Sequence, residues 1–392
     1  MKLALLTHEP FFPPSGGGSA ELLYLIKDLT QRDHEVHLFC PEFPNSKNVA
    51  KQFSIEIHPF KAWQMNRYTS FRSIKYLLYP IFLRKLVKKI ANNIQFDIIF
   101  SQHAISSVAA GKLKSDLKIP VVMNFLDHLT GFMETWPKWR MPRCILKHLK
   151  QFELNLPTRY KADFIFTVSQ ELSKRFIENG FSASRVTSIN YGYDERLFKL
   201  RKLKPQSPTT IVMHGSFDTH HLGQIATESI YSITLARPDV HFLFIGKETI
   251  ELKNLIKKIT NLSPKTNISC TGFINYELIS EKLYQGHVGI IPYEESSGAH
   301  CAFVAKMVEY AAVGLPVVST PLLGTKTFFL NEPTIIFSKF DSQTFARDTI
   351  QALNTNYQRI EAKRLSERVS NDLNWEIICK KVVDQLEEIH TC

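Results

Sequence analysis

The stretch Lys306-Met-Val-Glu-Tyr-Ala-Ala-Val-Gly-Leu-Pro-Val-Val-Ser-Thr320 predicts a helix, a stop and a buried strand. Its two adjacent alanines favour a helix. Gly314 can take the left-handed conformation that ends a helix, and the proline two residues later prevents continuation. The valines that follow favour a strand. Because Lys306 and Glu309 are separated by about one helical turn, we expect both side chains to project from one face.

A polar loop, Glu294-Glu-Ser-Ser-Gly-Ala-His300, opens into this predicted helix. Such a loop can present backbone N–H groups to an anion. A Lys and a Glu behind an anion-binding turn suit a ligand that carries both a diphosphate and a sugar, as a nucleotide-sugar does. The alternative interpretation is an amphipathic helix on which Glu309 and Lys306 are simply solvated.

The composition narrows the class of protein. The chain has 392 residues and a hydrophobic content of 44%, which suits two soluble domains of ordinary size. No run approaches the roughly 20 apolar residues of a membrane span, and His8 and Glu9 follow the first apolar run too soon for a signal peptide. The six cysteines are scattered and form no Cys-x-x-Cys pair, so we expect a reducing cytoplasm and no structural zinc.

The formal net charge is +11, and part of the excess is local. Eight Lys or Arg residues and no acid lie between Lys61 and Phe96, and a second basic stretch, Trp136–Lys150, contains two tryptophans. Basic and aromatic residues together suit an anionic membrane surface or an acceptor that carries phosphate. The alternative is a pair of solvated helix faces. Nucleic acid is not expected as a partner, because no nucleic-acid-binding motif accompanies the charge.

Strand-like and helix-like segments alternate along the chain, which predicts parallel sheets covered by helices on both faces. A charged, proline-containing stretch at 199–208 interrupts the alternation and marks a linker. The last segment, Trp375–Ile389, is a predicted helix. The predicted strands are 3–7, 35–40, 96–100, 120–125 and 164–168 before the linker, and 211–214, 240–245, 267–270, 288–291 and 317–320 after it.

With these segments in place, the chain resembles the family-4-type glycosyltransferases, also called glycosyl transferases group 1, which have the GT-B fold. The resemblance implies an α/β protein with two Rossmann-like domains that face each other across a cleft. Residues 1–198 would form the acceptor-side domain, residues 199–372 the nucleotide-sugar-binding domain, and 373–392 a helix that crosses back to the first. The segments that carry the resemblance are 11–20, 120–128, 162–198 and 306–320.

The resemblance also implies roles for particular residues. Glu309 would hold the ribose of the nucleotide, and Lys306 with the Ser297–Gly298 loop would lie near the diphosphate. Asp127 or His128, just past a strand, would orient or deprotonate an acceptor hydroxyl, and His103 is a weaker candidate at a similar position. The other donor-binding residues would be Gly17, Gly18, Gly215 and Lys247.

The sequence departs from the family pattern in the donor site. Ser216 stands where Arg is common, and His220 or His221 stands where Lys is common. Cys301 takes the place of the first of two glutamates. Lys306, Lys247 and the amides of residues 296–298 would have to hold the diphosphate instead. No Asp-x-Asp occurs, which agrees with a metal-independent transfer in which the nucleotide-sugar is a substrate and no cofactor is needed.

The function that the resemblance implies is a retaining transfer of a sugar to a glycan or lipid-linked acceptor, in the synthesis of polysaccharide or lipopolysaccharide. The enzyme would be cytoplasmic and peripheral on the inner face of the plasma membrane. Two alternatives stay open: a catalytically weak GT-B homologue that binds a glycan or a partner enzyme, and a GT-B-fold sugar 2-epimerase. A dinucleotide-binding loop is disfavoured, because Gly16 and Gly18 fit G-x-G but Glu21 occupies the third glycine position.

Overall fold

The computed structural model describes residues 1–14, 17–61, 72–202, 208–217 and 221–391, without the side chains of 72–76. The chain forms two compact units. Unit 1 comprises Met1–Met133, Pro137–Tyr191 and Trp375–Cys392, and unit 2 comprises Glu134–Trp136 and Gly192–Asn374. The units divide at residue 191, whereas the sequence predicts the division at residue 198.

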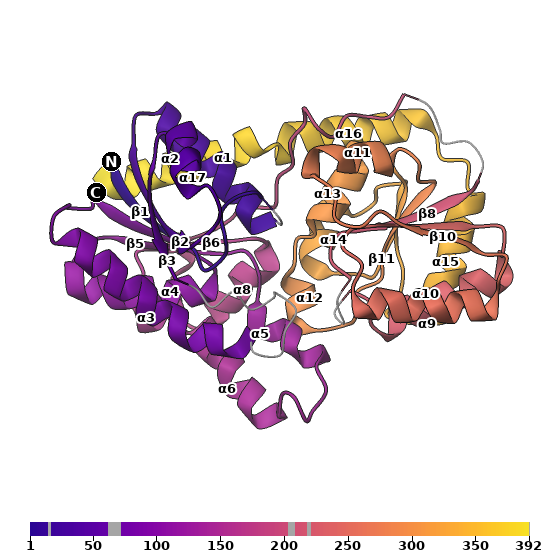
Figure 1. The fold of residues 1–392 in the computed structure, drawn as a ribbon, viewed down its shortest axis with the longest axis horizontal. Coiled ribbons are helices and arrows are strands. Elements are labelled where there is room, and N and C mark those ends of the chain that lie inside the picture. The colour runs from indigo at the N-terminus through magenta and orange to yellow at the C-terminus, as the bar shows by residue number, and fades with distance from the viewer. Residues whose placement is uncertain (15–16, 62–71, 203–207, 218–220, 392) are drawn as a thin grey trace. The chain divides into compact units, whose positions relative to one another are not determined.

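Unit 1 contains a seven-stranded sheet in the order β3-β2-β1-β4-β5-β6-β7, and every strand pair in it is parallel (Figure 1). The central strands are buried at every position rather than at alternate ones, as expected when helices cover both faces of a parallel sheet. The strands are β1 (Lys2–Leu6), β2 (Glu35–Pro41), β3 (Glu56–Phe60), β4 (Ile98–Gln102), β5 (Val121–Phe125), β6 (Phe164–Thr167) and β7 (Val186–Ser188).

The C-terminal helix belongs to unit 1, where it packs along the first helix (Figure 1). The ring of Tyr24 stacks on that of Trp375 with centroids 5.8 Å apart, and Arg32 forms ion pairs with Asp384 and Glu387. The helices of unit 1 are α1 (Gly17–Gln31), α2 (Ser46–Phe53), α3 (Arg72–Ala91), α4 (His103–Leu117), α5 (Leu129–Phe132), α6 (Arg143–Leu154), α7 (Leu156–Arg159), α8 (Gln170–Glu178) and α17 (Trp375–Thr391).

Unit 2 contains a six-stranded parallel sheet in the order β10-β9-β8-β11-β12-β13. Its strands are β8 (Thr210–His214), β9 (His241–Ile245), β10 (Asn267–Cys270), β11 (Val288–Ile291), β12 (Val317–Ser319) and β13 (Ile335–Phe337). Its helices are α9 (Gln224–Ala236), α10 (Ile250–Leu262), α11 (Ile279–Leu283), α12 (Ser297–Cys301), α13 (Ala305–Ala312), α14 (Leu323–Phe329), α15 (Ser342–Asn354) and α16 (Arg359–Leu373), and a 3₁₀ turn, η3, spans Tyr276–Leu278.

The predicted helix, stop and strand around residue 314 are confirmed. Helix α13 ends at Ala312, Gly314 has a φ of +71°, and β12 follows. The glycine has a second reason to be there, because a Cβ atom at this position would lie 2.5 Å from the Cδ1 atom of Leu200.

The strands that the sequence analysis missed are β3, β7 and β13, which lie at the edges of the two sheets. Strand β3 is only partly buried and contains Pro59, and proline is tolerated in a sheet mainly on an edge strand. The strands that were predicted are all present, within one or two residues at most ends.

The order of the strands indicates which edge of each sheet to search for a binding site. In each sheet, successive strands are added first towards one side and then towards the other. This reversal of strand order falls between β1 and β4 in unit 1 and between β8 and β11 in unit 2. In open α/β sheets, ligands bind at the carboxyl ends of the strands beside such a switch point. The residues that follow these four strands are therefore the first place to look for a site.

Candidate functional site

At the switch point of unit 2, Glu309 of α13 is buried beside the end of β8. Its side chain is 7% exposed. The Oε2 atom lies 2.5 Å from Nε2 of His214, the last residue of β8, and the Oε1 atom accepts a hydrogen bond of 2.8 Å from the hydroxyl of Tyr276. Glu309 is therefore not a solvated helix side chain, and the carboxylate has a fixed orientation.

Lys306, one turn before Glu309, lies over the loop that follows β8. A Cβ atom on Gly215 would be 2.5 Å from its Cε atom, and Gly215 has a φ of +109° that other residues rarely adopt. The ammonium group donates a hydrogen bond of 3.0 Å to the hydroxyl of Tyr293, which follows β11. One cation thus lies between the two strand ends of the switch point.

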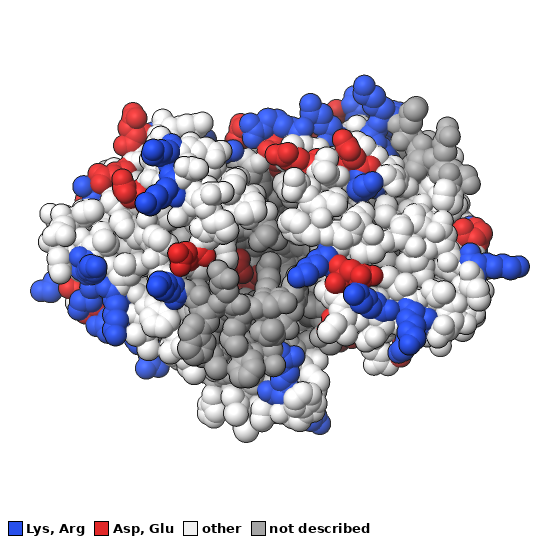
Figure 2. Space-filling view, in the orientation of Figure 1, with Lys and Arg blue, Asp and Glu red and all other residues white. Residues whose placement is uncertain are grey.

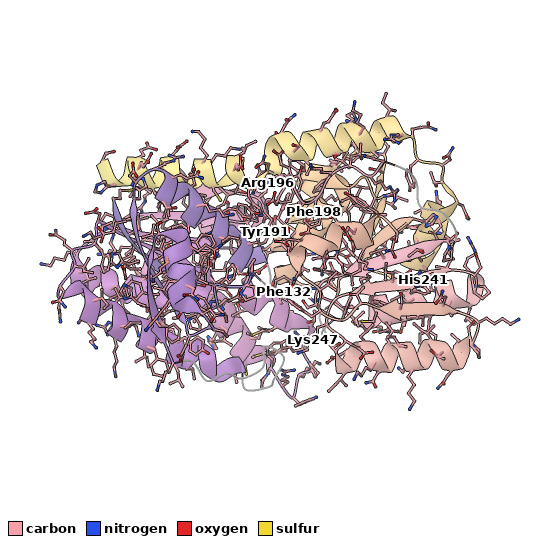
Figure 3. The ribbon with its side chains drawn as sticks, turned by 45° about the horizontal axis from the view of Figure 1, so that its top comes forward. Phe132, Tyr191, Arg196, Phe198, His241 and Lys247 are labelled. Carbon is pink, nitrogen blue, oxygen red and sulfur yellow. The ribbon has the colours of Figure 1, made fainter. Side chains whose placement is uncertain are left out.

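The other predicted donor-site residues of unit 2 follow its strands or lie in the first turn of α12. The backbone N–H of Ser297, at the start of α12, donates to Oε2 of Glu134 at 2.6 Å, so a carboxylate already occupies this amide. Gly298 is buried in the first turn of that helix. Lys247 is exposed beyond the carboxyl end of β9, opposite to the end where His241 lies (Figure 3). His220 lies outside the described residues, and the ring of His221 contacts that of Tyr293 at 5.0 Å.

At the switch point of unit 1, the start of α1 is packed tightly. A Cβ atom on Gly17 would lie 2.6 Å from the ring of Tyr191, and one on Gly18 would lie 2.8 Å from Nε2 of His103. Only glycine fits at either position. His103 itself has a φ of +65°, in the left-handed region that residues other than glycine adopt at some cost in strain. Gly16, which belongs to the same sequence motif, lies outside the described residues.

A buried carboxyl group, which the sequence analysis did not assign to a site, lies beneath this loop. Glu21 of α1 is 3% exposed and accepts hydrogen bonds from the side-chain amides of Gln102, at the end of β4, and Asn124, in β5. The same Gln102 amide donates to the carbonyl of Gly18 at 2.8 Å. Burial raises the pKa of Glu21 to about 7, although the two amides lower it. The only sequence signal was the pair of polar residues near the two strand ends.

The two predicted acceptor-side residues lie just after β5 and have different surroundings. The side chain of Asp127 is partly exposed, whereas that of His128 is fully buried with Nε2 3.9 Å from Oε2 of Glu153. Glu153 of α6 also accepts hydrogen bonds from the backbone amides of residues 129 and 130, at the start of α5. Asp127 is thus the more accessible of the two, and His128 is bound into a buried polar group.

The described residues give no indication of a resident metal ion. No three His, Cys, Asp or Glu side chains among them gather as metal ligands would. Nor is any helix among the described residues long and apolar enough to cross a bilayer.

The sequence matches two family descriptions, one for each part of the chain. Residues 15–197 match "Glycosyltransferase Family 4", and residues 208–355 match "Glycosyl transferases group 1". Among curated proteins, the chain is 21% identical over 384 residues to a phosphatidylinositol N-acetylglucosaminyltransferase subunit of Arabidopsis thaliana, covering 96% of this chain and 80% of that protein. It is 26% identical over 187 residues to a putative teichuronic acid biosynthesis glycosyltransferase, TuaH, of Bacillus subtilis, covering 46% and 45%.

Solved structures share the fold over the whole chain. A sucrose-phosphate synthase from Thermosynechococcus elongatus superposes with a TM-score of 0.80 at 16% identity, covering 100% of this chain and 99% of that one. The Anabaena protein HepE, solved in complex with UDP and glucose, superposes with a TM-score of 0.71 at 18% identity and 99% coverage of both. At these identities the likeness concerns the fold.

Proposed function

The chain belongs to the family-4 glycosyltransferases, with the GT-B fold, and we propose that it transfers a sugar, with retention of the anomeric configuration, from a nucleotide-sugar to a hydroxyl of a glycan or lipid-linked acceptor. The observation that carries this proposal is that a buried, oriented Glu309 and the cation of Lys306 lie one helical turn apart at the switch point of unit 2. A carboxylate suits the ribose hydroxyls, and the cation suits the diphosphate.

The nature of the donor is supported by relatives as well as by the site. The Anabaena neighbour has also been solved with UDP-glucose. Because Ser216 stands where Arg is common in the family, we expect Lys306 and the exposed Lys247 to contact the diphosphate. A diphosphate leaving group would be stabilised by such cations without a metal ion.

The nature of the acceptor is supported by the names of several relatives. The Arabidopsis relative is named for an acceptor that contains phosphatidylinositol, TuaH is named for teichuronic acid biosynthesis, and another structural neighbour is a lipopolysaccharide outer core galactosyltransferase. We therefore place the transfer in the synthesis of a cell-envelope polysaccharide or lipopolysaccharide. Asp127, partly exposed after β5, is the residue that we expect to orient the acceptor hydroxyl.

The proposal is tested by incubating the purified protein with a panel of nucleotide-sugars and measuring release of the nucleoside diphosphate. Slow hydrolysis of one donor, suppressed in Glu309→Ala, supports a transferase. A wild-type protein that binds no nucleotide-sugar in thermal-shift assays would instead favour the catalytically weak homologue. Proton NMR of the transferred sugar then decides between retention and inversion.

A peripheral membrane association belongs to the same proposal. Three basic regions could provide it, and they differ in their ion pairs and in their exposed apolar residues. In Figure 2, Lys and Arg side chains gather over α16, but Arg364 and Arg368 are both paired with Glu332. On α3, Arg84 and Lys88 share Asp116. Residues 62–71 of that basic stretch lie outside the described residues.

The region around α6 has a different character. No Asp or Glu occurs between residues 135 and 152, where Lys138, Arg140, Arg143, Lys147 and Lys150 lie. Large apolar side chains are exposed among them, with Trp139 85%, Ile145 49% and Phe152 37% exposed. Exposed aromatic and aliphatic residues among basic ones suit the headgroup region of an anionic bilayer. We therefore assign membrane contact to α6 and the loop before it rather than to α3.

This assignment is tested by co-sedimentation with vesicles of phosphatidylcholine that contain or lack phosphatidylglycerol. Replacement of Lys138, Lys147 and Lys150 by Gln should reduce binding to the anionic vesicles. The matched control replaces Lys253, Lys257 and Lys258 of α10 by Gln, which removes the same charge from exposed positions in unit 2. An equal loss of vesicle binding in both variants would show that only the net charge matters. If wild type does not bind anionic vesicles, α6 and the loop before it are not a membrane-binding surface.

A further inference from the structure

The carboxylate of Glu309 is held from two sides by side chains that come from distant parts of the chain. His214 ends β8 and donates to one oxygen, and Tyr276 lies in η3 and donates to the other. An ionised carboxylate only accepts hydrogen bonds, and each oxygen can accept two. Both oxygens therefore keep capacity for a ligand, in directions that the two donors leave open.

Packing fixes the two donors themselves. The ring of His214 meets that of Tyr310 edge to face with centroids 5.0 Å apart, and the Tyr310 hydroxyl accepts from the backbone N–H of His214 at 3.2 Å. The ring of Tyr276 packs against that of Phe198 with centroids 5.2 Å apart. Neither donor can leave the carboxylate without disturbing an aromatic contact.

The imidazole of His214 has few other polar contacts within unit 2. Its side chain is 5% exposed, and among the described residues Nδ1 has no hydrogen-bond partner. The one hydrogen bond that the structure gives the ring therefore goes to Glu309. Any effect of this imidazole on a ligand beside Glu309 would therefore have to be exerted through that carboxylate.

We propose that His214 and Tyr276 are positioning residues that hold the two oxygens of Glu309 for the 2′ and 3′ hydroxyls of the nucleotide ribose. They thereby set the preference of this enzyme for ribonucleotides over deoxyribonucleotides. The inference rests on the proposed function, because it assumes that a nucleotide binds at Glu309. A carboxylate held before binding loses less conformational freedom when the ligand arrives, so both bonds form at a lower entropic cost.

The test measures dissociation constants for a nucleoside diphosphate and its 2′-deoxy analogue by calorimetry. The diphosphate is the one among UDP, GDP, ADP and CDP that stabilises the protein most in a thermal-shift assay. Wild type should prefer the ribonucleotide about tenfold or more, the range for a hydrogen bond to a charged group. Tyr276→Phe, which removes one hydroxyl, should lower this preference about threefold to tenfold.

His214 is tested by a matched pair of variants. His214→Gln places an amide N–H near the position of Nε2 and should keep most of the preference for the ribonucleotide, whereas His214→Leu should lower that preference about as much as Tyr276→Phe does. The double variant should lose less than the product of the two single losses, because both act on one carboxylate. If His214→Leu fails to fold, the ribose preferences of Tyr276→Phe and His214→Gln still test the inference.

The outcomes separate the inference from the function on which it rests. Suppose that Glu309→Gln abolishes the ribose preference, but that Tyr276→Phe and His214→Leu lower the melting temperature and leave the preference unchanged. His214 and Tyr276 would then have a merely structural role, and the inference alone would be overturned. If Glu309→Gln also binds both nucleotides as wild type does, or if none of the four diphosphates binds, the nucleotide site lies elsewhere and the proposed function of Glu309 falls with the inference.

Discussion

Each unit contains one buried glutamate at the switch point of its sheet, and the two have opposite surroundings. Glu21 in unit 1 is bound by the neutral amides of Gln102 and Asn124, whereas Glu309 in unit 2 is bound by an imidazole and a phenol with Lys306 one helical turn away. Both oxygens of Glu21 accept from amides, which can bind a protonated or an ionised carboxyl group, whereas the surroundings of Glu309 combine two hydrogen-bond donors with a cation. We therefore propose a structural role for Glu21 and a ligand-binding role for Glu309.

The difference teaches that burial alone does not identify a functional carboxylate. Glu21 ties the end of β4 to the first turn of α1 through Gln102 and keeps the Gly17–Gly18 turn in place. Glu309 instead faces a set of polar groups at the carboxyl ends of β8 and β11, where ligands bind in such sheets. The predictions that follow test this division of roles, from the largest expected effect to the smallest.

The largest effect is expected at the acceptor side of unit 1. Asp127→Asn should lower the transfer rate by about 10²–10⁴, the usual contribution of a general base, and leave the affinity for the donor unchanged. Initial rates with saturating donor check this, with donor affinity measured separately. An unchanged rate would remove Asp127 from the acceptor role and turn attention to His103, whose strained backbone lies at the end of β4.

Glu21 should make the stability of the protein depend on pH. Its pKa rises from 4.5 to about 7 on folding, so the folded state holds a proton that the unfolded state has lost. The stability that this provides is fully present below about pH 4.5 and is lost as the pH rises towards 7, a change of about 3 kcal/mol.

Glu21→Gln removes this titration. The difference in unfolding free energy between the variant and wild type should therefore shift in favour of the variant by a similar amount between pH 4.5 and pH 8. Urea unfolding at several pH values measures it. If the curves of unfolding free energy against pH are parallel for the two proteins, Glu21 is already ionised in the folded state. The two buried glutamates would then not differ as described above.

Lys306 should contribute to binding of the diphosphate and little to packing. Lys306→Met keeps the apolar part of the side chain and removes the charge. Affinity for a nucleoside diphosphate should fall by about 1.5–3 kcal/mol, while the much weaker affinity for the nucleoside should not change. Calorimetry with both ligands checks this, and equal affinity of the variant and wild type for the diphosphate would move the phosphate site towards Lys247 or His221.

The smallest of these expected changes in free energy belongs to Gly215, the loop glycine of unit 2. Gly215→Ala must accommodate a φ of +109° and a contact with Lys306 Cε, the mobile end of a side chain. We expect a loss of about 1–2 kcal/mol, with a displaced Lys306 and weaker diphosphate binding. Gly180→Ala is the matched control, because its φ is +89° and nothing lies near its Cβ position. If both variants bind the diphosphate equally well, Lys306 does not need its place over the loop.

Much of this architecture could be predicted from local sequence. The stop at Gly314 and the cap at Ser169, whose hydroxyl accepts from the amide of Leu172, follow from residues within one turn of each other. The edge strand β3 was missed because it is short, partly exposed and interrupted by Pro59, so its apolar pattern is weak.

The candidate site could be predicted only in part. Glu309 and Lys306 are recognisable because they lie one turn apart in a characteristic segment. The hydrogen bond between His214 and Glu309 joins residues 95 positions apart, and that between Glu21 and Asn124 joins residues 103 positions apart. Such contacts depend on the order of strands in the sheet, which propensity and spacing do not reveal.

The central claim is that the nucleotide binds at the glutamate of unit 2 and not at that of unit 1. The most direct test gives both residues the same change and titrates one nucleoside diphosphate into wild type, Glu309→Gln and Glu21→Gln at pH 8. We predict that Glu309→Gln loses about tenfold or more in affinity, while Glu21→Gln binds as wild type does. A loss confined to Glu21→Gln, with Glu309→Gln unaffected, would contradict the account.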